Sequence, residues 1–244
     1  MFKFLIKSYV RLFGRNVVLC FHSVSDKGLS KNSFIKLIEL LEEVGYRFPD
    51  PNKSLFSENG KSAIITFDDG YRDNLEITNS FLCKKNIKPI IFVITKFLEG
   101  SIKDNAKYGI KNINHMTIEE AEASKKIVHF GFHTHSHDDI AKQDVENIYT
   151  SFSNGMGGYE KLLNKNQARY FAYPFGHLPK EQQEFNKLLE EFKFDRAFTT
   201  RWGAINKSKY RVNRVVIGDN DSPTKALLKI SGLLDAYALI KWRS

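Results

Sequence analysis

The sequence predicts an α/β protein, a distorted seven-stranded (β/α) barrel in a single domain. Seven short apolar runs recur along the 244 residues, with helix-like segments between them. Most runs lack polar alternation, which is typical of strands buried on both faces. Polar residues follow several different strands, whose ends converge on one mouth in a barrel. An open doubly wound sheet would concentrate its site at a single switch point, so we favour the barrel.

Residues 1–15 predict a basic amphipathic helix ahead of a domain spanning 16–244. Basic residues occupy every fourth position from Lys3 to Arg15 and share one helical face, opposite most of the apolar residues. The helix either lies on an anionic membrane surface or packs its apolar face onto the domain. The charges interrupt the apolar stretch, so we expect neither a cleaved secretory signal nor a spanning helix. In both cases we expect a cytoplasmic protein, which in the first case attaches peripherally to the inner membrane face.

The expected strands are short runs rich in aliphatic and aromatic residues, and the expected helices carry apolar residues at helical spacing, as Phe34, Leu37 and Leu41 do. The strands are expected at Asn16–His22, Ala63–Phe67, Pro89–Ile94, Ile127–Gly131, Arg169–Tyr173, Arg196–Thr200 and Tyr210–Ile217. The helices are expected at Phe34–Val44, Asn74–Lys85, Val145–Leu163, Lys180–Phe192 and Thr224–Leu239.

Composition narrows the class of protein. The 37 Lys and Arg against 28 Asp and Glu give a net charge of +9, which suits an acidic partner or serves only solubility. No nucleic-acid module is recognisable, so we expect no nucleic-acid binding. The two cysteines, Cys20 and Cys83, form no Cys-x-x-Cys, which argues against a disulfide framework and a cysteine zinc site. The absence of a Gly-rich phosphate loop argues against a dinucleotide site.

Two polar clusters consist of residue types that bind metal ions. Asp68 and Asp69 are adjacent carboxylates after a strand, so one must be neutralised, paired or placed on a cation, unless both cap a solvated turn. His133 and His137 follow another strand and share one face if they lie in a helical turn, although a chance histidine cluster gives the same spacing. Two imidazoles and one carboxylate with open positions form the ligand set of a hydrolytic metal site.

Two further segments contain residues that have either a functional or a purely structural explanation. Pro174 and Gly176 fix a tight turn around Phe175, which could aim a backbone N–H into the mouth. His22 closes the first strand, where a lone histidine is more often buried and hydrogen-bonded than catalytic. The aromatic candidates for a ligand-binding surface, which packing would explain equally well, are Tyr173, Phe175, His177 and Trp202.

Together these residues resemble the polysaccharide deacetylases, the fourth family of carbohydrate esterases. Thr66-Phe67-Asp68-Asp69-Gly70 is similar to the first motif of the family, and His133-Thr134-x-x-His137 to its second, His-[Ser/Thr]-x-x-His. The resemblance covers roughly residues 16–217 and implies a distorted (β/α) barrel with seven strands. It also implies that Asp68 is the general base and that Asp69, His133 and His137 hold a divalent metal. Zinc is the expected ion, and cobalt, nickel or iron suit the same ligands.

Two departures from the family pattern affect the catalytic residues. The Arg of the third motif is missing, because the stretch reads Ala-Tyr-Pro-Phe-Gly at 172–176, and we expect Arg214 to replace it beside the base. The catalytic His expected near the end of the domain is also missing. One branch of the family, resembling the exopolysaccharide poly-N-acetylglucosamine deacetylases, ends its first strand in Tyr-His, so we expect His22 to be the general acid.

The resemblance implies hydrolysis of an N-acetyl group on a sugar. A polymer, a lipid-linked oligosaccharide and a nucleotide sugar all remain open as substrates, and a glycan precursor of surface polysaccharide or lipopolysaccharide biosynthesis suits a cytoplasmic enzyme with a basic helix. Two alternatives remain. One is a non-catalytic glycan-binding protein that retains the fold, and the other is a metal-dependent amidohydrolase acting on a small C–N substrate.

Overall fold

The structure, a computed structural model, describes residues 2–53, 61–98, 100 and 111–235. Its seven strands form one parallel sheet in the order β6-β5-β4-β3-β2-β1-β7. Each strand overlaps one that the sequence predicts. The strands are β1 (Val17–Phe21), β2 (Ala63–Phe67), β3 (Ile90–Val93), β4 (His129–Phe132), β5 (Tyr170–Ala172), β6 (Arg196–Phe198) and β7 (Val215–Val216).

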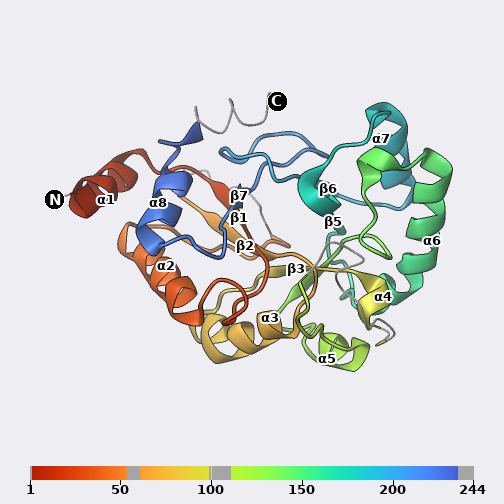
Figure 1. Cartoon of the computed structure of the whole chain (residues 1–244), viewed down its shortest axis with the longest axis horizontal. Helices are drawn as coiled ribbons and strands as arrows, with labels where there is room; N and C mark the ends of the chain where they lie inside the picture. Colours follow the sequence, from red (N-terminus) through yellow and green to blue (C-terminus); the bar gives the residue numbers. More distant parts are fainter. Residues whose placement is uncertain (1, 54–60, 99, 101–110, 236–244) are drawn as a thin grey trace.

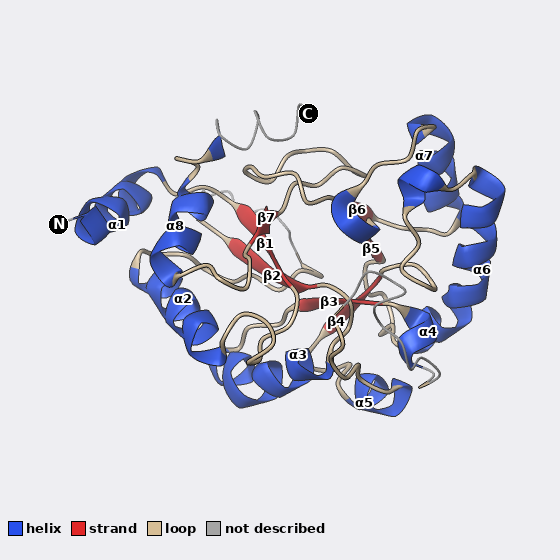
Figure 2. Cartoon of the chain, in the orientation of Figure 1, coloured by secondary structure: helices blue, strands red, loops and turns tan. Residues whose placement is uncertain are grey.

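The sheet curls in the centre of the molecule and the helices cover its outside (Figures 1 and 2). The helices are α1 (Phe2–Phe13), α2 (Lys31–Glu43), α3 (Arg72–Ile77), α4 (Thr95–Leu98), α5 (Ile118–Ala123), α6 (Val145–Lys161), α7 (Gln182–Glu191) and α8 (Pro223–Ser231). One π-helical segment (Thr78–Leu82) and three 3₁₀ segments (Cys83–Lys85, Ile140–Lys142 and Pro174–Gly176) complete the helical elements of the described residues.

The barrel is distorted at one seam. Strands β6 and β7 are the two ends of the sheet order, and their segments are joined by an isolated parallel bridge between Phe198 and Val212 in place of a continuous ladder. A large aromatic and aliphatic core fills the space between sheet and helices, and a smaller one, which includes Ile64, Phe92 and Phe198, lies on the other side of the sheet. The predicted fold class, a distorted (β/α) barrel with seven strands, is confirmed.

Helix boundaries differ from the predicted ones where local geometry overrides periodicity. The predicted helix at Asn74–Lys85 begins at Arg72 and changes from α to π and then to 3₁₀ geometry. The last helix begins at Pro223 behind an N-cap, Ser222, and ends at Ser231 because Gly232 adopts a φ of 86°. The part of its predicted range after residue 235 lies outside the described residues. Helices α4 and α5 have four and six residues, too few to show a period.

Helix α1 packs against α8 (Figure 1). Ile6 and Val10 are buried in the large core, and Arg15, just past the helix, forms an ion pair with Asp235. In the described part of the chain, no helix combines the length and the apolar character needed to cross a bilayer. The division into residues 1–15 and a domain at 16–244 stays a prediction.

Candidate active site

A cavity of about 510 Å³ opens at the carboxyl ends of the strands. Such ends meet at one mouth because all the strands run parallel. Its wall combines carboxylates, imidazoles and aromatic rings, and consists of His22, Asp68, Asp69, Tyr71, Lys111, His133, His137, Phe175, Thr200, Trp202, Val216, Ile217, Gly218, Asp219 and Lys229. Seven of the ten predicted site residues lie on this wall, and Arg214 lies directly behind one of them, Asp68.

Asp68 forms a buried ion pair with Arg214. The guanidinium donates from Nη1 to Oδ1 at 2.6 Å and from Nη2 to Oδ2 at 2.7 Å. Burial alone would favour the neutral acid, but Arg214 lowers the pKa of Asp68 well below its ordinary value. The charge on Asp68 raises the pKa of Arg214 in turn, although burial opposes this. Asp68 is therefore ionised and fixed in orientation, and Arg214 lies where we expected it to replace the missing third-motif Arg.

Arg214 reaches this position from the residue just before β7. Its Nε donates to the carbonyl of Thr199 at 2.9 Å, and its guanidinium lies 5.3 Å from the centre of the Phe92 ring. The side chain is fully buried, and a buried charge must be compensated. The bidentate carboxylate and polar groups of neighbouring strands provide this compensation.

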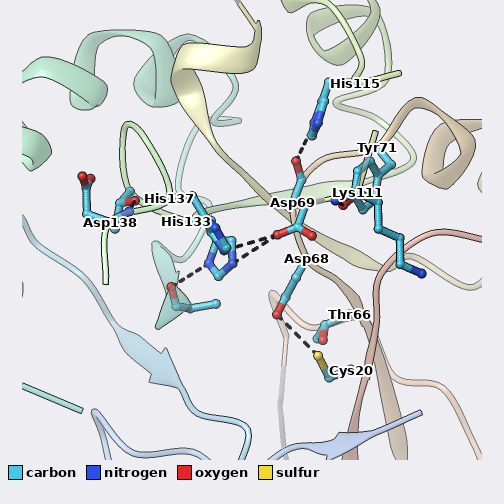
Figure 3. Close-up of polar contacts among 12 residues, drawn as sticks. Cys20, Thr66, Asp68, Asp69, Tyr71, Lys111, His115, His133, His137 and Asp138 are labelled. Carbon is cyan, nitrogen blue, oxygen red and sulfur yellow. Dashed lines mark hydrogen bonds and ion pairs between the residues drawn. The ribbon is translucent and has the colours of Figure 1, made fainter. Parts of the chain in front are cut away.

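Asp69 turns in the opposite direction from Asp68, because its backbone has a left-handed φ of 71°. Its carboxylate is directed at two imidazoles, as Figure 3 shows, while the ring of His115 bonds the Asp69 backbone carbonyl at 2.9 Å. Gly70, also at a φ of 71°, lies against Val93, so that a Cβ there would meet the Val93 side chain at 3.3 Å. The strained turn separates the two adjacent carboxylates into two environments.

His133 and His137 come together at the end of β4. Their ring centres are 5.1 Å apart, and both side chains are almost fully buried. The segment is not a helical turn, because Thr134 and His137 have left-handed φ values of 64° and 59°. The Nδ1–H of His133 donates to the carbonyl of Ala172 at 2.8 Å, which directs Nε2 at Asp69. Burial lowers the pKa of His133 to about 4, so its ring is neutral at pH 7.

The geometry of these three side chains fits a divalent metal ion. Asp69 Oδ1 lies 3.6 Å from Nε2 of His133 and 3.6 Å from Nε2 of His137, and a tetrahedral ion with ligands at 2.0–2.1 Å spaces its ligand atoms by roughly 3.3 Å. Within the described part of the chain, Asp69 Oδ1 is buried without a hydrogen-bond partner. Two imidazole nitrogens directed at one unpartnered carboxylate oxygen, at the spacing of metal ligands, fit a shared cation.

His22 lies at the end of β1, next to the base candidate. A ring nitrogen of His22, Cys20 Sγ and a carboxylate oxygen of Asp68 all lie within 4.8 Å of one another. The side chain of His22 is half-buried and lines the cavity, which leaves it accessible to a bound ligand. The structure thus places the ring of His22 beside Asp68 on the cavity wall.

The third segment places its aromatic residues differently from our expectation. Phe175 lines the cavity, with its ring 4.4 Å from that of His137. The prediction that Tyr173 binds the ligand is wrong, because its ring is fully buried in the core and its hydroxyl donates to the carbonyl of Tyr210 at 2.9 Å. His177 does not line the cavity either, because its ring is drawn to the carboxylate of Asp139 at 3.1 Å, outside the mouth.

The far wall of the cavity contains residues that we did not predict from the sequence, although Trp202 was among the candidates. The ammonium of Lys229 lies 4.8 Å from the Trp202 ring and is bound by the carboxylate of Asp221. Lys111 forms an ion pair with Asp219 across the edge of the cavity. Lysines on an amphipathic helix or a loop resemble solvated surface residues, so the sequence contains no pattern that distinguishes them.

Comparison with known proteins agrees with this geometry. The family model described as polysaccharide deacetylase matches residues 57–193, which is more than half of the chain. A Bacillus subtilis (strain 168) protein, YxkH, which carries polysaccharide deacetylase in its name, is 23% identical over 210 residues. That match covers 81% of this chain and 70% of the relative.

Two solved structures share the fold at low identity. The Streptococcus pyogenes deacetylase PplD, in complex with acetate, superposes with a TM-score of 0.69 at 21% identity, over 88% of this chain and 97% of that chain. IcaB from Ammonifex degensii superposes with a TM-score of 0.69 at 24% identity, over 89% of this chain and 97% of that one. With the family model matched across both motifs and the same barrel found in these proteins, this chain belongs to the polysaccharide deacetylase family.

Proposed function

We propose that this chain is a metal-dependent N-deacetylase that removes acetyl groups from an amino sugar of a polysaccharide or of a lipid-linked glycan precursor. One observation carries the proposal. The Asp69, His133 and His137 side chains converge within metal-binding distance beside the ion pair of Asp68 and Arg214, on the wall of one cavity. Such a site has an open position for water and substrate, unlike a closed structural site.

The donor set of Asp69, His133 and His137 would hold the ion, and zinc suits two imidazoles and a carboxylate best, with cobalt, nickel or iron as further candidates. When bound, such an ion supplies Lewis acidity toward a carbonyl oxygen and lowers the pKa of water. The remaining chemistry belongs to the side chains around it.

Asp68 acts as the general base in this mechanism. It accepts a proton from water as the water oxygen bonds to the acetyl carbon, and Arg214 keeps its carboxylate ionised and directed. His22 then donates a proton to the sugar nitrogen as the C–N bond breaks. The products are acetate and a free amine. The Phe175 turn at the rim supplies a backbone N–H for the oxygen that gains charge.

The cavity supports a sugar as the substrate. Its volume lies within the range of small-ligand sites, and Trp202 and Phe175 offer aromatic faces that suit the apolar face of a sugar ring. The Streptococcus pyogenes relative binds acetate, which is the product that N-deacetylation releases. A glycan precursor of surface polysaccharide or lipopolysaccharide biosynthesis is the substrate class that we propose.

The test combines metal analysis with acetate release from a panel of N-acetylated glycans. Wild-type protein should bind about one metal ion per chain and release acetate from at least one glycan. Asp68→Asn should retain the metal and lose activity by about 10²–10⁴-fold, whereas the exposed control Asp26→Asn should behave as wild type.

Three other outcomes would contradict the proposal. Loss of metal from Asp68→Asn would mean that Asp68 and Asp69 have exchanged roles. A metal-loaded protein that is inactive on every acetylated sugar would be a glycan-binding protein. Activity confined to small amides would identify an amidohydrolase for small substrates.

A further inference from the structure

Exposed large hydrophobic side chains are concentrated on α1. In the described part of the chain, four of the seven exposed large hydrophobic residues belong to this one helix: Phe4 (69% exposed), Leu5 (58%), Leu12 (75%) and Phe13 (63%). Single exposed apolar residues are normal on a protein surface, but a cluster on one helix indicates an interaction site.

Three of the exposed apolar residues share the outer half of the helix. At 100° per residue, Ile6 and Val10 point toward the domain, and the opposite half contains Phe4, Leu5, Ser8 and Leu12, with one charged residue, Arg11, toward its edge. We define the outer face of α1 as Phe4, Leu5, Ser8 and Leu12, and Phe13, the last residue of the helix, is exposed beside it.

Two basic residues of α1, Lys7 and Arg11, lie along one edge of the outer face. Lys7 bonds the Glu43 carboxylate at 2.7 Å, and Arg11, which is 52% exposed on its side chain, lies 3.7 Å from the same group. The arrangement differs from simple packing of the apolar face on the domain, because most apolar residues of α1 remain in contact with solvent.

The surroundings of the outer face are positively charged. Among the described residues, Lys7 and Arg11 share the Glu43 carboxylate, Arg15 pairs with Asp235, and Lys61 bonds the backbone carbonyl of Arg11, so that the four cations outnumber these two carboxylates. The chain as a whole carries +9. An apolar helical face bordered by cations is complementary to an anionic bilayer surface, where acyl chains lie below negative headgroups.

We propose that the outer face of α1 docks the protein onto an anionic lipid bilayer, with the helix lying in the headgroup layer. Its 12 residues are too few to span a bilayer, and a second copy is a poor partner because like charges would repel across the contact. Docking here holds the cavity one helix away from the bilayer, since α1 packs on α8 and Lys229 of α8 lines the cavity.

Co-sedimentation of the full chain with lipid vesicles tests the proposal. Binding is compared between vesicles of phosphatidylglycerol and phosphatidylcholine in equal amounts and vesicles of phosphatidylcholine alone. Wild type should bind the anionic vesicles more tightly, and added NaCl should weaken this binding. The double variant Leu12→Ser/Phe13→Ser should bind at least about tenfold more weakly. Tyr149→Ser removes an exposed aromatic residue on α6 and should bind as wild type.

Three results would overturn the proposal. The first is no binding of wild type to anionic vesicles, and the second is unchanged binding of the double variant. The third is a wild-type dimer in sedimentation velocity that the double variant converts to a monomer, which would assign the face to a second copy. If the double variant unfolds, Leu5→Ser and Leu12→Ser replace it with the same expectation. Vesicle binding is measured without substrate, so its failure is distinct from failure of the deacetylase proposal.

Discussion

At the residue scale, the site depends on one buried pair of charges. Asp68 and Arg214 are both almost fully buried, and two short hydrogen bonds join them. Taking either charge out of water costs several kcal/mol, which only the partner offsets. The pair therefore fixes the orientation of the base candidate, Asp68. Each buried charge is stabilised by the other, so loss of one partner leaves the other charged and unpaired.

This dependence can be measured with a double-mutant cycle in urea unfolding. Arg214→Met and Asp68→Leu should each lower the free energy of unfolding by about 3–5 kcal/mol, because each leaves an unpaired buried charge. The double variant should lose clearly less than the sum of the two. Additive losses would show that the two charges are not coupled. Asp68→Asn should be milder, because its amide still accepts a bond from Arg214.

At the element scale, residues at the start of α3 hold the loop that contains His22 by hydrogen bonds. The Asn74 amide donates to the carbonyl of His22 at 2.8 Å and to the Asp73 carboxylate at 2.9 Å. That carboxylate also accepts from the Ser23 hydroxyl at 2.5 Å and from the Val24 N–H at 3.2 Å. The DDGYRDN stretch thus continues the site from the carboxylates at the end of β2 to the histidine at the end of β1.

Removing the hydrogen bond from Asn74 to the His22 carbonyl should impair catalysis without removing the metal. Asn74→Ala should lower kcat by about 10–100-fold with little change in KM, because His22 loses its orientation while Asp69, His133 and His137 keep theirs. The measurements are steady-state kinetics, metal content and the alkaline limb of the kcat pH profile, which should change shape if His22 is the acid. Ser80→Ala, on the exposed side of the same helical segment, is the control. Loss of metal together with activity would contradict the positioning role.

The opposite end of β4 contains a second buried histidine. His129 Nε2 bonds the Asp50 carboxylate at 2.8 Å, and burial lowers the pKa of His129 although Asp50 opposes this. Because the folded-state pKa lies below the unfolded value of about 6.5, the neutral ring contributes stability above that pH, and the contribution is lost as the pH falls through the folded-state pKa.

His129→Gln keeps a donor for Asp50 and removes the titration. The free energy of unfolding should therefore decline less between pH 7 and pH 5 in this variant than in wild type. Urea unfolding at the two pH values provides the measurement, with His177→Gln, a half-exposed histidine near the cavity mouth, as the control. An equal decline in both proteins would show that His129 contributes nothing to acid sensitivity.

At the scale of the whole molecule, the curled parallel sheet assembles the site from distant segments. His22 follows β1, the two aspartates follow β2, the two histidines that we propose as metal ligands follow β4, and Arg214 precedes β7. A metal that binds only the folded chain must therefore stabilise the whole barrel, because its ligands come from separate strands.

Thermal unfolding with and without zinc tests this coupling. Zinc at 100 times its Kd should raise the free energy of unfolding by about 2.7 kcal/mol, which corresponds to an increase in Tm of roughly 5–10 °C for a chain of this length. His137→Asn should abolish the increase, and a chelator should reverse it in wild type. An equal increase in His137→Asn would place the zinc elsewhere.

The sequence by itself determined the seven strands, the barrel and the residues of both motifs, because continuous apolar runs and the fixed order of Asp-Asp and His-x-x-x-His are local properties. Only the tertiary structure decided which way each side chain faces. A strand buried on both faces has no polar alternation, so the sequence could not show that Tyr173 points into the core. The resemblance to the family led us to expect Arg214 beside Asp68, but no pattern in the sequence could place Lys229 beside Trp202, because contacts between residues far apart in the chain exist only after the sheet has curled.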